Sequence, residues 1–426
     1  MEYDEPNQTR LATLPTQCRP PVESAREDQA ISGTSDSNDT LAIIAVTLAA
    51  IGAFLNVFAT QPLLPLFEQI FHASKAEVGR TVSVTTLGVA LSATFWGALA
   101  ERVGRRKVIV LSTFLLAIPT ILTATSGSLT QVVIWRFLQG IIVPGIFAVT
   151  IAYITEEWPR SRVPRVMSIY ICGVTLGGFL GRLLPGIATS HQLIPFVAPN
   201  WRNGFIAIGA IDGVFGFLLW CWLPHDSPPA AGADNRTNIA RHFRNPQLIA
   251  TCAVGFNVFF SLVATFSYVT FYLAAPPFNL SPAKLGALFM VYLVGLIVTP
   301  LGGIWISNVG SRTALICSVG ASILGILLTL IPNLLVIIFG LIICSSGVFI
   351  CQTASNSYIQ RIAQSGGRAS ATGLYVMVYY TGGGVAGVLP GLLWRYGQWK
   401  ACVALIVFVQ AVSVTIAGSI WKGKDS

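Results

Sequence analysis

Long apolar runs alternate with short polar stretches along most of the chain. A helix needs about 20 apolar residues to cross the hydrocarbon core of a bilayer, which is roughly 30 Å thick. Runs of this length lie at 41–67, 78–100, 107–126, 129–154, 165–189, 203–223, 247–275, 283–307, 313–331, 334–359, 369–394 and 400–421. The pattern therefore predicts an all-α membrane protein with twelve transmembrane helices.

The polar stretches divide these helices into two sets of six. Residues 1–39 are rich in Ser, Thr, Asp and Glu and predict a disordered cytoplasmic tail. A polar stretch over 225–246 follows the sixth run and predicts a cytoplasmic linker. The expected domains are thus the tail, a six-helix bundle over 40–224, the linker, and a second bundle over 247–426.

Two motifs recur at one constant offset. Gly97, Gly104 and Arg106 return as Gly303, Gly310 and Arg312, and Gly177, Gly178 and Gly181 return as Gly383, Gly384 and Gly387. All six pairs are separated by 206 residues (310 − 104 and 383 − 177, for example). A shared offset between unrelated motifs indicates a tandem duplication, so the two bundles should be related by pseudo-symmetry.

Composition and charge place the protein in a membrane and orient it there. Hydrophobic residues make up 54% and charged residues 10% of the chain, more apolar surface than a soluble domain can bury. Loops after even-numbered runs, with the C-terminal tail, hold fifteen Lys and Arg, against six after odd-numbered runs. The positive-inside rule then puts both termini in the cytoplasm. The cations form no continuous basic face, which argues against nucleic-acid binding.

Few charged residues fall inside the apolar runs. Arg136 lies in the fourth run, Arg182 in the fifth and Asp212 near the middle of the sixth. A charge at membrane depth costs several kcal/mol unless it is paired or faces water, which marks all three as functional candidates. The alternatives are that Arg136 extends toward the interface and that Asp212 makes a structural polar contact. The eight cysteines show no metal-ligand spacing, so we expect no metal site and no cofactor.

The loop after the second run resembles the signature loop of the major facilitator superfamily of secondary transporters. The resemblance implies a gating latch, made of Gly97, Glu101, Arg102, Gly104, Arg105, Arg106, Glu156 and Glu157. In this latch Gly97 permits close helix approach and Gly104 forms a tight turn. The acid Glu101 caps a helix of the opposite bundle. Arg102 or Arg105 pairs with Glu156 or Glu157. The alternative is that the cations only anchor the loop to the headgroups.

Two further motifs resemble those of the same family. Arg136, Gln139 and Gly140 match its helix-four motif and share one helix face. Gly173, Gly177, Gly178 and Gly181 are similar to its glycine-rich helix-five motif of antiporters, which allows close backbone packing. From the helix-four motif and from the charges at membrane depth, we expect Arg136, Gln139, Gly140, Arg182 and Asp212 to serve coupling or anion binding.

In the resembled fold, the first, fourth, seventh and tenth helices line a central cavity. The polar residues of these helices are Asn56, Thr60, Gln61, Gln139, Asn257, Ser261, Tyr268, Gln352 and Asn356, and Tyr375 and Tyr379 add aromatic walls from the eleventh. Each could instead make an interhelical hydrogen bond.

The sequence shows no nucleotide-binding loop and no catalytic constellation, so we expect a transporter and not an enzyme. The 165–191 region, with Tyr153-Ile-Thr-Glu-Glu before it, resembles bacterial efflux permeases. This resemblance predicts proton-coupled efflux of a small molecule by rocker-switch alternating access across a bacterial inner membrane, with the monomer as the working unit. The alternatives are uptake or exchange of a small organic anion, and a non-transporting membrane sensor or scaffold.

Overall fold

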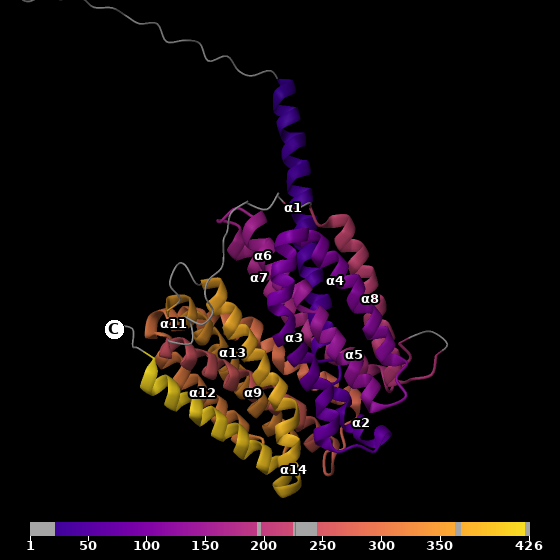
Figure 1. Cartoon of the computed structure of the whole chain (residues 1–426), viewed down its shortest axis with the longest axis vertical. Coiled ribbons are helices and arrows are strands. Elements are labelled where there is room, and N and C mark those ends of the chain that lie inside the picture. The colour runs from indigo at the N-terminus through magenta and orange to yellow at the C-terminus, as the bar shows by residue number, and fades with distance from the viewer. Residues whose placement is uncertain (1–21, 194–196, 225, 227–244, 363–367, 422–426) are drawn as a thin grey trace, which may run out of the picture.

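The computed structural model describes residues 22–193, 197–224, 226, 245–362 and 368–421. Within these ranges every regular element is a helix (Figure 1). The N-terminal half contains α1 (Val22–Val57), η1 (Gln61–Leu63), α2 (Leu64–Phe71), α3 (Lys75–Val103), α4 (Arg105–Ala124), α5 (Leu129–Ile142), α6 (Pro144–Glu157), α7 (Val163–Ala188) and α8 (Trp201–Trp222). The C-terminal half contains α9 (Pro246–Ala274), α10 (Pro282–Leu288), η3 (Phe289–Val294), α11 (Gly295–Val309), α12 (Ser311–Leu328), α13 (Leu334–Ile362) and α14 (Arg368–Ile420).

These helices make twelve membrane passes, as the apolar runs predict. Several passes are built of consecutive helices, such as α5 with α6, which meet where Pro144 interrupts the backbone donors. The last two passes form α14, which has 53 residues, about 80 Å of helix and far more than one crossing needs. Its backbone leaves the helical region at Gly397 and Gln398, between the two apolar runs.

The first helix departs from prediction at its start. The sequence predicts a disordered tail over 1–39, yet α1 begins at Val22, so the prediction is wrong for residues 22–39. Extending an existing helix costs far less than nucleating one, and no proline interrupts this stretch after Pro21. Residues 1–21 lie outside the described residues, as does most of the predicted linker.

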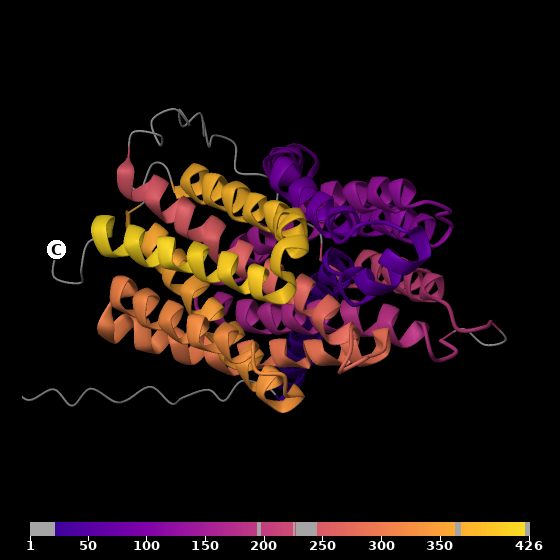
Figure 2. The ribbon, with the colours of Figure 1, turned by 90° about the horizontal axis from the view of Figure 1, so that it is seen from below.

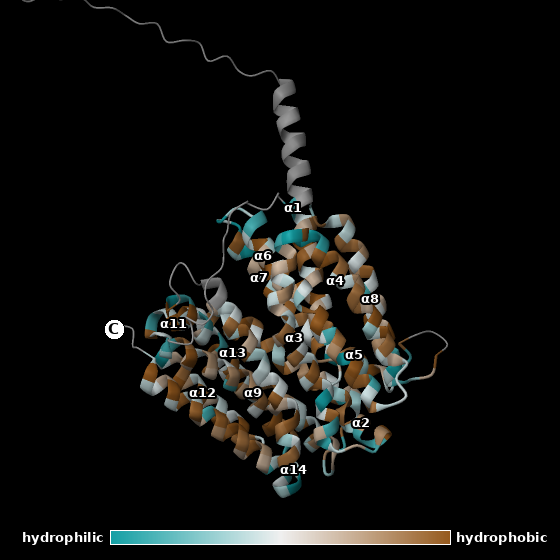
Figure 3. Cartoon of the chain, viewed as in Figure 1, coloured by the Kyte–Doolittle hydropathy of each residue, from teal (hydrophilic) through white to brown (hydrophobic). Residues whose placement is uncertain are grey.

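Hydrophobic residues predominate along the helices, and hydrophilic residues gather near their ends (Figure 3). Leu91, Phe95, Leu335 and Phe408 are each more than 60% exposed. A water-soluble protein would not expose so many large apolar side chains. They form the lipid-facing surface of a multi-pass membrane protein.

The two halves lie side by side in both ribbon views (Figures 1 and 2). They meet along two helix pairs, α3 with α14 and α7 with α10. At the first seam, a Cβ on Gly79 would collide with the carbonyl oxygen of Gly387. At the second, a Cβ on Gly286 would lie 2.9 Å from the carbonyl oxygen of Arg182. Glycine therefore allows the backbones of the two halves to touch.

Both seams lie toward one end of the molecule, which we call the contact end. It carries the chain turns at 72–74, 275–281 and 397–398. The opposite end carries the turns at Gly104 and Gly310, where φ is +102° and +84°, and we call it the glycine-turn end.

Candidate functional site

The interior of the N-terminal half contains a connected set of buried polar side chains. Asn56 Nδ2 donates to Asp212 Oδ2 at 2.8 Å, and Asn56 Oδ1 accepts from Thr120 Oγ1 at 2.6 Å. Gln139 Nε2 donates to Thr120 Oγ1 at 3.2 Å, and Gln139 Oε1 accepts from Arg136. All five residues are at most 1% exposed. Four of them were predicted from sequence, and the structure joins them through Thr120, which was not.

Arg136 is held by neutral acceptors. Its guanidinium donates to the carbonyl oxygens of Asn56 and Val57, each at 2.6 Å, and to that of Thr81 at 3.3 Å. The first two carbonyls belong to the last turn of α1, where the helical hydrogen bonds end and leave acceptors unsatisfied. A cation at this position also complements the helix dipole. Arg136 therefore caps α1 from within the bundle and does not extend to the interface.

Gly140 brings α5 against α3. A Cβ on Gly140 would lie 2.9 Å from the carbonyl carbon of Thr85. This close approach places Arg136, one turn earlier, within reach of Thr81. The helix-four motif thus works as a unit in which the glycine sets the distance across which the arginine bonds.

Asp212 is fully buried at the end of the polar network. One carboxyl oxygen accepts from Asn56, and the other, Oδ1, has no hydrogen-bond partner among the described residues. It forms no ion pair with a described cation, since the three ion pairs found join Lys75 to Glu68, Arg105 to Glu156 and Arg162 to Asp39. Asp212 is therefore linked to Arg136 indirectly, through Asn56, Thr120 and Gln139.

Arg182 lies at the contact between the halves. It is 2% exposed, and its Nε donates to Gln61 Oε1 at 2.6 Å. Its Cζ atom is 4.4 Å from the ring centroid of Phe58, 4.8 Å from that of Phe289 and 4.6 Å from that of Tyr292. The aromatic partners could not be found from sequence, because they come from elements far apart along the chain.

The signature loop forms a turn that ties α4 to α8. Gly104 adopts a positive φ between α3 and α4, a conformation that glycine adopts without strain. Asp226 accepts from the backbone N–H of Arg106 at 2.8 Å and so caps α4. The Arg106 side chain in turn donates to the carbonyl oxygens of Leu223 and Trp220, both at 2.6 Å, which end α8.

The structure contains only part of the predicted latch. Arg105 pairs with Glu156, which is one of the two acids expected from the sequence as its partner. A Cβ on Gly97, however, would have no neighbouring atom within 4 Å, so this face of α3 is open and Gly97 makes no close helix approach in this conformation. The side chains of Glu101 and Arg102 are exposed, and the side chain that caps α4 is that of Asp226. Glu157 also makes a contact.

The repeated loop of the second half makes the same kind of turn and helix cap. Arg312, the counterpart of Arg106, donates to the carbonyl oxygen of Gly418 near the end of α14. Gly310 has a positive φ, as Gly104 does. In each half, an arginine at the start of the third pass therefore caps the last pass.

The glycine motif of α7 packs this helix on α1. A Cβ would lie 2.9 Å from the Thr47 carbonyl oxygen at Gly173 and 2.5 Å from the Ile51 carbonyl oxygen at Gly177, and at Gly181 it would collide with Leu55. Gly178 instead offers its carbonyl oxygen to Arg182. The motif thus brings α7 against α1 and also accepts a bond from the buried arginine.

The predicted cavity-lining residues separate into three groups. The first group is at most 1% exposed and does not line an open cavity in this conformation: Asn56, Thr60, Gln61, Gln139 and Tyr268. All of these except Thr60 are held in the interior by hydrogen bonds between helices. Asn257 and Ser261 line a small pocket between α9, α12, α13 and α14. Gln352 is half-buried and Asn356 exposed.

Tyr375 and Tyr379 form part of a buried aromatic cluster at mid-depth. The Tyr379 ring stacks on Phe259 with centroids 4.3 Å apart, and Tyr380 meets Phe147 of the other half at 6.0 Å. Sequence reasoning missed Phe147 and Tyr380, although the adjacent tyrosines of α14 were a signal. Within the described residues, no three His, Cys, Asp or Glu side chains are grouped to hold a metal ion.

The chain is similar to known proteins over most of its length. The family model described as Major Facilitator Superfamily matches residues 46–417. An inner membrane transport protein, YnfM of Escherichia coli (strain K12), is 32% identical over 87% of this chain and 89% of its own length. An uncharacterized transporter of Buchnera aphidicola subsp. Schizaphis graminum (strain Sg) is 29% identical over 88% of this chain and 90% of its own.

Solved structures share the fold. A bacterial homolog of the human lysosomal transporter Spinster, inward-facing and unoccupied, superposes with a TM-score of 0.76 at 17% identity, covering 89% of this chain and 96% of that one. A variant of the nucleoside transporter NupG gives a TM-score of 0.75 at 13% identity over 89% and 100%.

Proposed function

This chain belongs to the Major Facilitator Superfamily, and we propose that it exports a small molecule in exchange for protons by rocker-switch alternating access. The observation that carries the coupling proposal is the buried network around Asp212. The seams α3–α14 and α7–α10 at one end support the rocking, because two bodies that touch at one end can pivot there. The working unit in this proposal is the monomer.

The orientation follows from the distribution of Lys and Arg. On the positive-inside rule the glycine-turn end faces the cytoplasm, so the contact end faces outward. A chain closed at its contact end is then inward-facing, which agrees with the state named for one structural neighbour. The inner membrane of a bacterium is the proposed location, in line with a similar protein of Escherichia coli.

Asp212 is the proposed proton carrier. A buried carboxylate that lacks a cationic partner is costly, and a bound proton removes its charge. Asn56 links it to Thr120 and to the backbone of α1 at Gly52. The segment that follows α1 is η1, whose Gln61 bonds to Ser267 of the second half. A change in the charge of Asp212 can therefore act on the helix that leads into this contact between the halves.

At the glycine-turn end, the pair between Arg105 and Glu156 is the proposed latch. Glu156 is the next-to-last residue of α6, and Arg105 is the first residue of α4. The pair is partly exposed, so it can form and break at low energy cost.

A transport assay tests the proposed function. Purified protein in proteoliposomes receives an imposed pH gradient, and candidate sugars, organic anions and drugs are screened for flux. We expect one class to move against its own gradient only while the pH gradient lasts, and a protonophore should abolish this movement. Flux that ignores the pH gradient would contradict proton coupling, and the absence of flux for every class would favour a sensor or scaffold.

One observation favours a second candidate function, the uptake or exchange of a small organic anion. Arg182 is buried, and its described partners are an amide oxygen, a carbonyl oxygen and three aromatic rings. An anionic substrate would supply the opposite charge that this site lacks. The substitutions of Arg182 that distinguish the two functions are given in the Discussion.

A further inference from the structure

At the contact end, two cations of the N-terminal half lie against aromatic rings of the C-terminal half. Arg182 of α7 meets Phe289 and Tyr292 of η3, as described above. Lys75 of α3 has its Nζ atom 5.2 Å from the ring centroid of Phe271 and 5.3 Å from that of Trp394. Each cation therefore meets two rings of the second half, one cation beside each of the two helix-pair seams.

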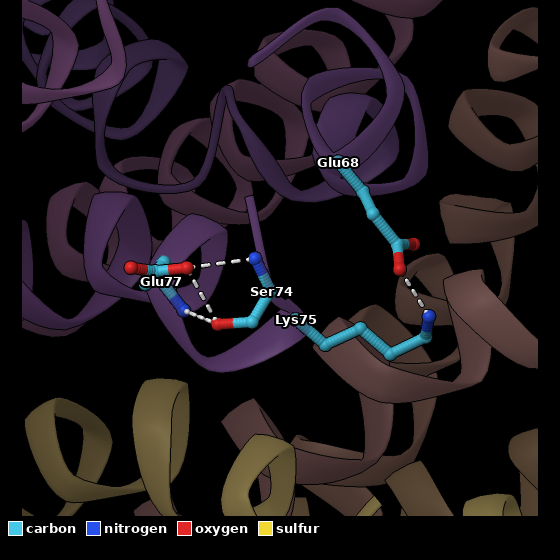
Figure 4. A network of polar contacts seen from close by, with 4 residues as sticks. All are labelled: Glu68, Ser74, Lys75 and Glu77. Atoms are coloured by element: carbon cyan, nitrogen blue, oxygen red, sulfur yellow. Dashed lines mark hydrogen bonds and ion pairs between the residues drawn. The ribbon is translucent and has the colours of Figure 1, made fainter. Parts of the chain in front are cut away.

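The two contacts differ in exposure. Lys75 is anchored on its own half by Glu68, next to the capping box in which Ser74 and Glu77 start α3 (Figure 4). Its side chain is 21% exposed. Arg182 is buried and is also linked to the other half through Gln61, whose Nε2 donates to Ser267 Oγ at 2.9 Å. The Arg182 contact should be the stronger one, because desolvation strengthens the attraction between a cation and a ring.

The composition of the C-terminal half explains why aromatic rings, and not carboxylates, meet the two cations. Residues 247–424 contain no Asp or Glu, so no cation of the first half can form a salt bridge across a seam. The face of an aromatic ring is the alternative that an acid-free partner offers. The attraction acts only within about 6 Å of the ring, so it ends when the halves separate by a few ångströms.

We propose that these two cation–aromatic contacts hold the contact end closed and set how often it opens. This inference rests on the proposed rocking motion, in which the contact end must open for the other end to close. Arg182 and Lys75 are positioning residues on this proposal, since they act on the conformational equilibrium and need not touch the substrate.

Spin labels on the full-length protein can measure the equilibrium. In a background with Cys18, Cys172, Cys221 and Cys317 replaced by serine, labels at Ser190 and Ala275 report the separation at the contact end. Labels at Thr155 and Ser307 report the glycine-turn end. Cys18 lies outside the described residues, and the other seven positions are exposed.

The test variant is Phe289→Leu with Tyr292→Leu. We expect the ratio of open to closed contact ends to rise about tenfold, because two cation–π contacts are lost. Phe266→Leu is the matched control: Phe266 packs on Phe289 and Tyr292 at 5.8 and 4.5 Å, and no contact between it and Arg182 is found within the described chain. It should leave the ratio nearly unchanged, as should Tyr292→Phe. At the seam between α3 and α14, Trp394→Leu should raise the ratio of open to closed contact ends by a smaller factor.

A double-mutant cycle separates the cation from general packing. In an Arg182→Gln background, adding the two leucines should no longer change the ratio. The proposal is overturned if the leucines act equally in that background, or if Phe266→Leu opens the contact end as far as the test variant. If the contact end opens and the glycine-turn end does not close, the rocking mechanism fails while the lock stands.

Discussion

In both halves, polar side chains in the interior join different membrane passes, but among the described residues only those of the first half include Arg and Asp. In the first half, Asn56, Thr120, Gln139, Arg136 and Asp212 join four passes through a network with an ionisable side chain at each end. In the second half, Gln410 donates to Ser322 Oγ at 2.9 Å, and Ser322 Oγ lies 3.4 Å from Cys344 Sγ. These neutral groups also join different passes, but they carry no ionised side chain.

The difference indicates a division of labour after duplication. Structural features that both halves need are retained, such as the arginines that cap their last passes. Ionisable groups at membrane depth are costly wherever they serve no purpose, and charged side chains are absent from the described interior of the second half. Coupling is therefore expected in the first half, and the following experiments test that assignment.

The largest expected effect comes from Asp212→Asn. The amide keeps the shape and the bond to Asn56 but cannot bind and release a proton. Proton-driven transport should be abolished, whereas exchange of substrate for substrate should continue, and both are measured in proteoliposomes. Intact proton-driven flux would move the coupling site to Glu101, Glu156 or the substrate itself.

Substitution of Arg182 distinguishes the two candidate functions. If the substrate is an anion, Arg182→Gln should abolish substrate binding, and Arg182→Lys should keep part of it because the charge remains while the two-pronged geometry is lost. Binding is measured by titration calorimetry in detergent. Normal binding and flux in Arg182→Gln would exclude the anion candidate and leave the seam contact as the role of this residue.

Matched substitutions of two buried glutamines compare the halves directly. Gln139→Leu leaves a donor of Arg136 unpaired and should cost about 1–3 kcal/mol, with at least tenfold lower transport. Gln410→Leu loses one neutral bond, and its Oε1 has no described partner, so the cost should be only about 0.5–1.5 kcal/mol. Thermal unfolding and flux give both values. Equal losses would contradict the division of labour.

The capping arginines should behave alike in both halves. Arg106→Ala removes two bonds from the side chain to the end of α8 and should cost about 1–2 kcal/mol. Arg312→Ala removes the bond to Gly418 and should cost about 1 kcal/mol. Melting temperatures in detergent measure both. A neutral result for either would show that water replaces that cap.

The smallest effect on stability is expected at the latch. Arg105→Ala or Glu156→Gln should change stability by only about 0–1 kcal/mol, because the pair is partly exposed. Transport should fall several-fold in each, and the double variant should be no worse than either alone. Lys107→Ala, which removes an exposed cation two residues further along α4, is the matched control. Full activity in the double variant would exclude the latch.

The sequence predicted the membrane passes and the repeat, and it located several site residues without their contacts. Arg136 and Asp212 were identified because a charge inside an apolar run is rare, and Gln139 because it shares a motif with Arg136. Their common partner Thr120 gave no such signal, since threonine often bonds within its own helix, as Thr120 also does with Leu116. Asp226 was missed as a helix cap because it lies 120 residues from Arg106 along the chain.

By itself the sequence determined the number of passes, their order and the turns at Gly104 and Gly310, because hydrophobic length and glycine conformation are local properties. Only the tertiary structure decided which polar atoms meet. Asn56 and Gln352 both lie on predicted cavity helices, yet one is buried at the centre of a network and the other is half-buried. Periodicity places a residue on a helix face, but the neighbour that face meets depends on how twelve helices pack.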